Sequence, residues 1–308
     1  MSVQDRLVVI LGPTATGKSS LAISLAEKLH GEILACDSTQ VYRRFDIGTA
    51  KISPGERRGI PHHLLDVVEP TEIFTAGDYQ RRASEVLADL RRRKKLAIVT
   101  AGTGLYLKAL LEGLSDAPTR SEELRRRLRD KAAQRGPSSL HKLLHRLDPD
   151  ASRRIAERDT QKVIRALEMR LLAGKPVGEI HRRGRKSLEG YEVKKIGLLP
   201  PRPALYARID ARVRAMVEAG WIEEVQALIA SGVPEGAKPF QFIGYSQLHE
   251  HLAGRLSKED AIHQIQQATR QFAKRQITWF RKETEVHWLA GFGDDPEIAA
   301  ASLEFLRR

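Results

Sequence analysis

The chain has few of the residues on which secreted and membrane proteins depend. One cysteine, Cys36, occurs among 308 residues, which excludes internal disulfides and zinc sites of the C-x-x-C type. No apolar run approaches the roughly 18 residues of a membrane-spanning helix. The first apolar run, Leu7 to Leu11, ends at Gly12 and is too short for a secretory signal. We therefore expect a cytoplasmic protein with no membrane partner.

Acidic residues are outnumbered, and the imbalance is local. The chain carries 52 Lys and Arg residues against 39 Asp and Glu, a formal net charge of +13. Between Arg120 and Lys186 there are 20 basic and 9 acidic residues, so this segment holds most of the excess. Scattered charge would serve solubility as well, whereas a concentrated basic field predicts a polyanionic partner larger than a nucleotide, such as a nucleic acid.

Strand and helix patterns alternate in the first part of the chain. Apolar strand patterns cover residues 7–11, 32–36 and 95–100, and helical patterns follow at 18–29, 78–93 and 105–111. Such alternation is typical of a parallel sheet covered by helices, and the fold class we predict is an α/β, P-loop NTPase-like sheet flanked by helices.

The pattern changes near Asp116. Charged, amphipathic helices are predicted at 121–135, 138–147 and 150–173, with no strand between them. A strand follows at 193–199, then helices at 203–219, 222–230 and 258–282, with an exposed loop predicted at 231–239. We therefore expect an all-helical domain, residues 116–189, inserted into a catalytic core formed by residues 1–115 and 190–308.

The residues between the first strand and the first helix match the phosphate-loop pattern G-x-x-x-x-G-K-[ST]. Two glycines allow the backbone to turn its N–H groups toward an anion, and the following helix adds its positive N-terminal end. Lys18 can reach terminal phosphates, and the Ser19 hydroxyl can join the coordination shell of Mg²⁺. The alternative is a glycine-rich turn that binds nothing. The predicted phosphate ligands are Gly12, Pro13, Thr14, Ala15, Thr16, Gly17, Lys18 and Ser19.

Polar residues also follow the second and third predicted strands. Asp37 ends the second, and Thr100 to Gly104 ends the third. Ligands of open parallel sheets bind beyond the carboxyl ends of the strands, so both segments are expected beside the phosphate loop. Asp37 could accept a proton or bind Mg²⁺ through water. Equally, Asp37 could cap a turn, and the Gly102–Gly104 segment could be a plain strand–helix turn.

Three further groups have functional and structural interpretations. Arg208 and Arg212 lie four residues apart, so they can present two guanidinium groups to a diphosphate or form a solvated face. The segment 269–281 carries Arg270, Lys274 and Arg281 near one stripe, which suits contact with a nucleic-acid backbone or a basic surface helix. His62 and His63 are adjacent, so their side chains diverge on a strand, which argues against a two-histidine metal clamp. We expect one of them to be hydrogen-bonded structurally and the other to lie near the substrate.

With these motifs in place, nearly the whole chain resembles the tRNA dimethylallyltransferases, also called tRNA isopentenyltransferases. The phosphate loop is common to many families, but the remaining motifs in this order are specific. They are Asp37 to Tyr42, Asp46 to Lys51, Ile60 to Asp66, Gly102 to Tyr106, Ile164 to Glu168, Ile243 to Tyr245 and Thr269 to Arg281. The chain departs from the usual family residue at Ala101 (Gly), Arg158 (Asn), Lys162 (Arg) and Gln247 (Glu). The substitutions at Arg158 and Lys162 bear on contacts with tRNA rather than on the activity.

The resemblance implies transfer of a dimethylallyl group from dimethylallyl diphosphate to N6 of the adenosine just 3′ of the anticodon, position 37. It implies that the phosphate loop holds the diphosphate and Mg²⁺, with Ser19 toward the metal. Asp37 would accept the N6 proton or orient the amine, while Lys18, Thr103 and Arg208 would stabilise the leaving diphosphate. The tRNA anticodon stem-loop would be contacted by Asp37, Ser38, Thr39, Gln40, Thr103, Arg125, Gln161, Lys162, Val163, Ile164, Arg165, Arg270 and Lys274. We expect the chain to act as a monomer.

Three other functions share some of these features. A P-loop kinase of a small metabolite would use ATP, but it would leave the basic segment unexplained. An enzyme that prenylates free adenylate would need a smaller basic domain. A non-catalytic RNA-binding NTPase or chaperone would tolerate the loss of Asp37.

Overall fold

A computed structural model of the chain describes residues 6–136, 138–182 and 186–308. The chain forms two compact units. The larger comprises Met1–Leu110 and Glu189–Arg308, and the smaller comprises Leu111–Leu188.

The described part of the larger unit contains a six-stranded sheet in the order β3-β2-β4-β1-β5-β6. Every neighbouring pair of strands is parallel, which confirms the predicted sheet class. The strands are β1 (Arg6–Leu11), β2 (Gly31–Cys36), β3 (His62–His63), β4 (Leu96–Ala101), β5 (Glu192–Leu198) and β6 (Val286–Leu289). The two edge strands, β3 and β6, were not predicted from the sequence as separate strands of the sheet, because each is only a few residues long.

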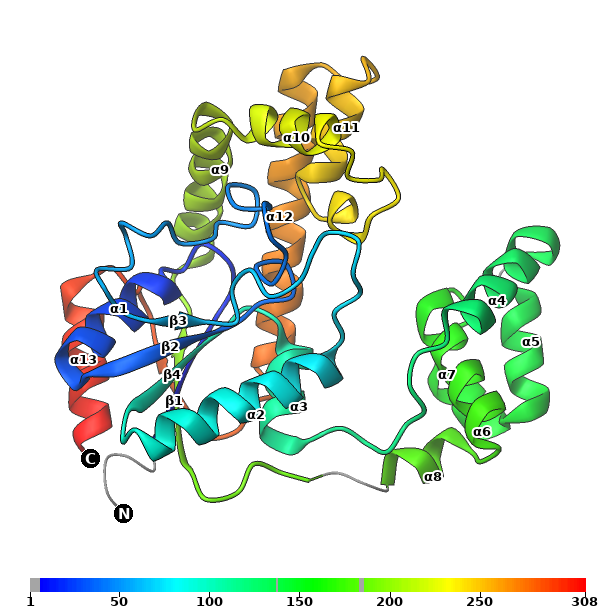
Figure 1. The fold of residues 1–308 in the computed structure, drawn as a ribbon, viewed down its shortest axis with the longest axis horizontal. Helices are drawn as coiled ribbons and strands as arrows, with labels where there is room; N and C mark the ends of the chain where they lie inside the picture. The colour runs from blue at the N-terminus through cyan, green and yellow to red at the C-terminus, as the bar shows by residue number, and fades with distance from the viewer. Residues whose placement is uncertain (1–5, 137, 183–185) are drawn as a thin grey trace. The chain divides into compact units, whose positions relative to one another are not determined.

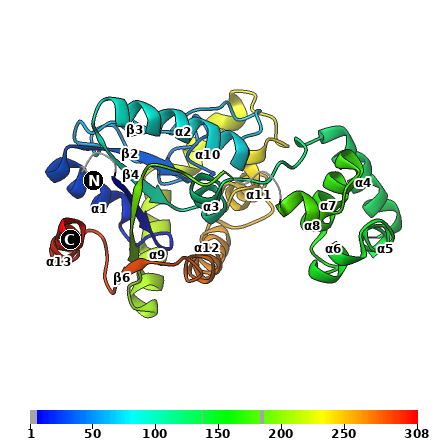
Figure 2. The same cartoon turned by 90° about the horizontal axis from the view of Figure 1, so that it is seen from below.

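Helices cover both faces of the sheet (Figures 1 and 2). Helices α1 (Lys18–Leu29) and α13 (Pro296–Arg307) pack together on one face, and α2 (Ala76–Arg92) lies on the other. Burial on both faces explains why the central strands are nearly continuous apolar runs. Val8 and Ile10 of β1 meet Leu21 and Leu25 of α1 in the core of this face.

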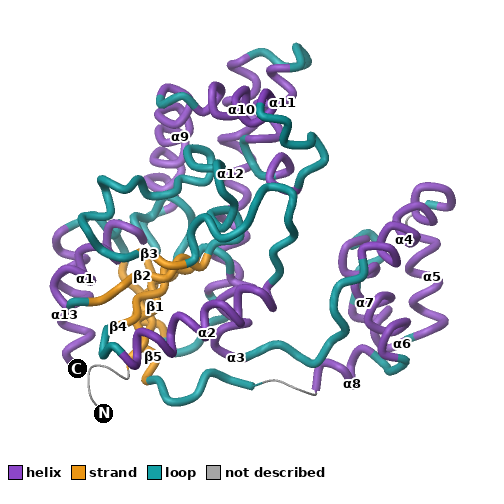
Figure 3. The backbone as a smooth tube through the Cα atoms, in the orientation of Figure 1, coloured by secondary structure: helices purple, strands orange, loops and turns teal. Residues whose placement is uncertain are grey.

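Residues 37–75, between β2 and α2, form a long connection that is mostly loop (Figure 3). This segment contributes Tyr42 and Phe45 to a second apolar cluster, together with Trp221 and Tyr245. The helices of the cluster are α9 (Arg202–Glu218), α10 (Trp221–Ala230), α11 (Tyr245–Leu252) and α12 (Lys258–Phe280). The long loop is thereby held against the carboxyl edge of the sheet, where β2 ends.

The expectation of an exposed loop at 231–239 is wrong for part of that segment. Val233 and Ala237 are buried in the second apolar cluster, and residues Lys238–Gln241 form a 3₁₀ turn. The small and polar residues around them resemble a surface loop in sequence. Packing of the few apolar side chains against neighbouring helices outweighs that local pattern.

The smaller unit is helical and has its own core. Its described helices are α4 (Glu122–Arg135), α5 (Ser138–Leu147), α6 (Pro149–Arg154), α7 (Thr160–Ala173) and α8 (Val177–Arg182). The single helix expected over 150–173 is wrong. The chain becomes extended at Ile155, and α7 starts anew after Asp159, whose side chain accepts a hydrogen bond from the Lys162 N–H as an N-cap.

The remaining helix that bears on the site is α3 (Gly104–Glu112), which begins directly after β4. None of the helices in the described residues combines the length and the apolar character needed to cross a bilayer.

Candidate active site at the carboxyl edge of the sheet

The phosphate-loop motif forms a tight turn between β1 and α1. Gly12 has φ of 152° and Gly17 has φ of 79°, and a Cβ on Gly12 would lie 2.7 Å from the Leu198 carbonyl oxygen. Gly17 caps α1 without a side-chain hydrogen bond, so no side chain competes for the first N–H groups of the helix. Those N–H groups and the helix dipole suit an anion.

Lys18 lies inside this turn. Its Nζ donates hydrogen bonds to the Gly12 carbonyl at 2.9 Å and to the Pro13 carbonyl at 2.8 Å. Burial lowers the pKa of Lys18 to about 8, an effect that the nearby Asp37 carboxylate opposes and Arg212 reinforces. The nearby carboxylate therefore does not fully compensate for burial of the ammonium group, and a bound phosphate would add the missing negative charge.

Two adjoining cavities meet at Asp37. The first, about 460 Å³, is lined by the phosphate loop, Ser19, Gly102, Arg208 and Gln276. The second, about 380 Å³, has apolar walls that include Ile209, Val213, Met216, Trp221, Phe242 and Ile243. Their shared lining residues are Thr14, Ala15, Asp37, Thr49, Ala50, Arg212 and Phe272. The site thus joins a phosphate compartment to an apolar compartment, with a carboxylate between them.

The two carboxylate oxygens of Asp37 have different surroundings. Oδ1 accepts hydrogen bonds from the Thr39 N–H at 2.8 Å and from the Thr39 hydroxyl at 2.6 Å. The turn-capping interpretation is therefore correct for this oxygen. Oδ2 faces Gly102, where a Cβ would lie only 2.5 Å from it. This oxygen remains available to a substrate, since nothing in the described residues donates to it.

Thr103 lies beside Asp37 because β2 and β4 end side by side. The Gly102 and Thr103 N–H groups both donate to the Cys36 carbonyl. Thr103 Oγ1 accepts from the Ser38 N–H at 3.0 Å and donates to the Ser38 hydroxyl over 3.2 Å. The segments after the second and third predicted strands thus form one wall, as the parallel-sheet argument required.

Gln276 is a site residue that the sequence analysis missed. It is buried within α12, and its Oε1 accepts from the Thr14 N–H at 2.8 Å. Its Nε2 donates to the Gly102 carbonyl at 2.7 Å. One side chain therefore bridges the phosphate loop and the Gly102 turn. The sequence feature that could have identified Gln276 is a polar residue at an inward-facing position of a basic helix.

The predicted cations near the site differ in their engagement. Arg208 of α9 forms an ion pair with Asp294 at 2.8 Å and lies over the Phe292 ring, while still lining the first cavity. Arg270 of α12 is paired with Asp210 at 2.5 Å, and Lys274 is exposed.

Gln40 has a more specific position than its sequence suggested. Its Nε2 donates to the Thr49 and Ala50 carbonyls, at 3.1 and 3.2 Å, so it fixes the backbone that lines both cavities. Only its Oε1 remains for a ligand.

The two adjacent histidines lie on β3 and point to different partners. His62 Nδ1 lies 2.8 Å from the Ile60 carbonyl, and His63 Nε2 lies 2.8 Å from Glu32 Oε2. Both therefore have a polar partner, as expected for one of them, but neither lines either cavity, so the structure does not bring the other beside the substrate site. Within the described residues, no group of three or more His, Cys, Asp and Glu side chains could hold a metal ion.

In the helical unit, the predicted tRNA-binding residues fall into two groups. Gln161 and Lys162 are exposed at the start of α7, although Lys162 Nζ lies 2.5 Å from Asp159. Val163 and Ile164 belong to the core of the unit, so their side chains face inward.

The others of this set, Arg125 and Arg165, share Glu168. Arg125 is buried and donates to both Glu168 oxygens, at 2.9 and 2.8 Å, and Arg165 donates to Oε2. Burial alone would raise the pKa of Glu168, but these hydrogen bonds lower it to about 2. The carboxylate stays charged and ties α4 to α7. Contact of this set with tRNA stays a prediction.

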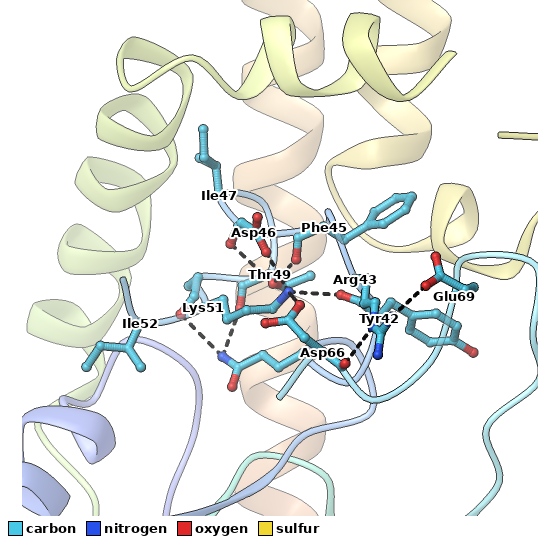
Figure 4. Close-up of polar contacts among 12 residues, drawn as sticks. Tyr42, Arg43, Phe45, Asp46, Ile47, Thr49, Lys51, Ile52, Asp66 and Glu69 are labelled. Carbon is cyan, nitrogen blue, oxygen red and sulfur yellow. Dashed lines mark hydrogen bonds and ion pairs between the residues drawn. The ribbon is translucent and has the colours of Figure 1, made fainter. Parts of the chain in front are cut away.

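A buried lysine holds the loop that leads into the site (Figure 4). The Lys51 side chain is 3% exposed, and its Nζ contacts Asp46 Oδ1 at 2.5 Å, Asp66 Oδ1 at 2.6 Å and the Tyr42 carbonyl at 2.9 Å. Glu224 of α10 holds the other side of this loop by accepting from the Asp46 and Ile47 N–H groups. The loop is therefore fixed from two sides before it reaches Thr49 and Ala50.

Replacing Lys51 with methionine is expected to lower the free energy of unfolding by about 2 kcal/mol, because two carboxylates lose their charged donor. Chemical denaturation measures the change. The matched control is Lys28→Met on the exposed face of α1, which should leave stability nearly unchanged. Equal stability of the two variants would show that the Lys51 contacts contribute nothing.

Comparison with known proteins places these features in a family. Residues 40–283 match the family model described as IPP transferase. A protein named tRNA dimethylallyltransferase from Solibacter usitatus is 51% identical over 298 residues, covering 97% of both chains. The solved structure of a tRNA isopentenylpyrophosphate transferase from Bacillus halodurans is 36% identical, with a TM-score of 0.71 over 98% of this chain and 97% of that one. A eukaryotic dimethylallyltransferase, described as acting on tRNA, is 28% identical, with a TM-score of 0.76 over 93% of this chain and 74% of that one.

Proposed function

The chain belongs to the IPP transferase family, and from this membership and the geometry of the site we propose that it prenylates tRNA. The reaction transfers the dimethylallyl group of dimethylallyl diphosphate to N6 of the adenosine 3′ of the anticodon, position 37. The observation that carries the proposal is the position of Asp37, between a phosphate compartment and an apolar compartment. The dimethylallyl group is apolar, so its transfer requires an apolar compartment that a phosphate loop alone does not imply.

The chemistry requires one bond to break and one to form. The C1–O bond to the diphosphate breaks, N6 forms a bond to C1, and N6 loses a proton. Asp37 Oδ2 is the acceptor for that proton or orients the amine, while Oδ1 remains held by Thr39. Lys18, Thr103 and Arg208 stabilise the diphosphate as negative charge accumulates on it.

The donor set on this wall suits Mg²⁺ bound together with the diphosphate. Ser19 and Asp37 line the same cavity and offer hard oxygen donors. Magnesium in such sites retains several waters and needs only one or two protein ligands besides the substrate phosphates. When bound, the ion would neutralise part of the charge on the diphosphate.

The basic helical unit favours tRNA over free adenylate as the acceptor. Its excess of Lys and Arg suits the phosphates of an anticodon stem-loop. An acceptor adenosine must leave its stack to reach Asp37, as bases do in enzymes that modify them. We extend the proposal to action in the cytoplasm, as a monomer.

A transfer assay tests the proposed function. Radiolabelled dimethylallyl diphosphate and Mg²⁺ are supplied with either unmodified tRNA or AMP. Label on tRNA alone supports the proposal. Label on AMP makes the protein an adenylate prenyltransferase, and ATP hydrolysis without label makes the phosphate loop that of an NTPase or kinase.

Binding of the diphosphate should depend on pH through Lys18. A bound anion stabilises the ammonium and raises the pKa of Lys18 above the value of about 8 that it has without ligand. Binding above that pH therefore requires proton uptake. The final phosphate pKa of the substrate is about 6, so the substrate does not titrate in this range. We expect affinity to change little from about pH 7 to pH 8 and to fall up to tenfold per pH unit above it.

Calorimetry without tRNA, in buffers of different ionisation enthalpy near pH 8.5, measures the proton uptake. Lys18→Arg is the control, because a guanidinium stays charged throughout this range. Affinity in the parent protein that does not change with pH would contradict the role of Lys18.

A further inference from the structure

Trp279 lies at the C-terminal end of α12 and is 42% exposed despite its size. One part of its indole lies against Gly104, the first residue of α3, where a Cβ would overlap Cδ1 and Nε1 of the ring. The backbone of a glycine thus supports the ring, and much of the ring stays open to solvent. Its neighbour Leu105 is also exposed, at 49%.

This tryptophan is held next to the catalytic wall. Gly104 directly follows Thr103, and Gln276, less than one turn before Trp279 on α12, donates to the Gly102 carbonyl. Two consecutive parts of α12 therefore contact the Gly102–Gly104 turn. The hydrogen bond of Gln276 fixes the backbone of α12 at this turn, and the helix holds Trp279 beside it.

Exposed cations flank Trp279 along the chain. Arg275 lies four residues before it on the same face of α12, and Lys282 lies in the turn that follows the helix; both are exposed. An aromatic ring flanked by cations is the arrangement with which proteins bind unstacked nucleic acid. The base stacks on the ring, and the cations meet the adjacent phosphates.

We propose that Trp279 is the stacking platform for a nucleobase next to the acceptor adenosine in the tRNA loop. The inference rests on the proposed function. When the adenosine turns into the pocket beside Asp37, its neighbours lose a stacking partner, and the indole beside Thr103 replaces it. Arg275 and Lys282 contact the phosphates on either side. Trp279 thereby favours the extruded state of the RNA, and it contributes to binding of RNA but not of diphosphate.

The first test uses an anticodon stem-loop RNA and versions with an abasic site on either side of the acceptor. We expect Trp279→Ala to raise KM for the intact RNA about tenfold, with KM for dimethylallyl diphosphate unchanged. Trp279→Phe should restore most of the loss. With the parent protein, one of the two abasic RNAs should show the same increase in KM. Trp279→Ala should then raise KM for that abasic RNA no further. The matched control is Trp288→Ala, since Trp288 is 36% exposed on the edge strand β6 and packs against Gly197 rather than Gly104.

A second measurement does not depend on turnover. Stacking on a base quenches indole fluorescence, so RNA binding should quench the parent protein and the Trp288→Phe variant more than Trp279→Phe, which keeps Trp221 in the wall of the second cavity. If Trp279→Ala transferred to RNA with an unchanged KM, the stacking role would be overturned and the proposed function would stand. The same holds if the effects of Trp279→Ala and of the abasic site were fully additive. If the parent binds RNA without prenylating it, the proposed function fails, and Trp279-dependent quenching still decides whether the platform exists.

Discussion

Replacing Asp37 with alanine is expected to lower single-turnover transfer to tRNA by at least about 10²-fold, because the N6 proton loses its acceptor. Affinity for tRNA should change little, since the proposed phosphate contacts lie on other residues. Rapid-quench measurement with saturating tRNA and labelled dimethylallyl diphosphate isolates the chemical step. Near-normal turnover would remove Asp37 from the mechanism and favour a non-catalytic RNA-binding protein.

Asp37→Asn separates the two oxygens of this side chain. The amide oxygen of asparagine can still accept from Thr39, so the turn keeps its cap. The amide has no basic oxygen to take a proton in place of Oδ2. We therefore expect Asp37→Asn to be as slow as Asp37→Ala. Full recovery of the rate in Asp37→Asn would mean that Asp37 acts by holding the turn.

The meeting of Asp37 and Thr103 was predictable, because it follows from short-range patterns and one rule of parallel sheets. Apolar runs mark β2 and β4, and the ends of neighbouring parallel strands share an edge. The phosphate loop was predictable for the same reason, since its strand, turn and helix are contiguous in sequence.

Gln276 and Lys51 could not be found in this way. Gln276 contacts Thr14 across 262 residues of sequence, and its role depends on where α12 packs. Lys51 is charged and would ordinarily be exposed; only the fold brings Asp46 and Asp66 to its ammonium. The break between α6 and α7 escaped prediction because the helical periodicity continues across Ile155, while the local cap at Asp159 decides the outcome. Long-range packing and single capping contacts are thus the parts of the site and fold that patterns miss.

Binding of tRNA should weaken steeply with salt if the helical unit contacts several phosphates. Each neutralised phosphate releases condensed counterions, so about six contacts would lower affinity by about 10³-fold between roughly 50 and 200 mM salt. Anisotropy of labelled tRNA, measured without dimethylallyl diphosphate, gives the slope. A flat dependence would contradict the role proposed for the helical unit, whatever the transfer activity.

The slope can also be assigned to residues. Arg158 and Lys162 are both exposed near the start of α7, so Arg158→Gln with Lys162→Gln should reduce the magnitude of the logarithmic slope by about 2 if both meet phosphates. Binding of Lys162 to a phosphate requires release from Asp159, so its share can be smaller. The control is Arg92→Gln. Arg92 is equally exposed, but it ends α2, which runs antiparallel to the strands, so it lies at the edge of the sheet opposite the site. Because Arg92→Gln removes one charge and the double substitution removes two, a change in slope half as large in Arg92→Gln would mean that the dependence reports net charge rather than a tRNA-binding surface on the helical unit.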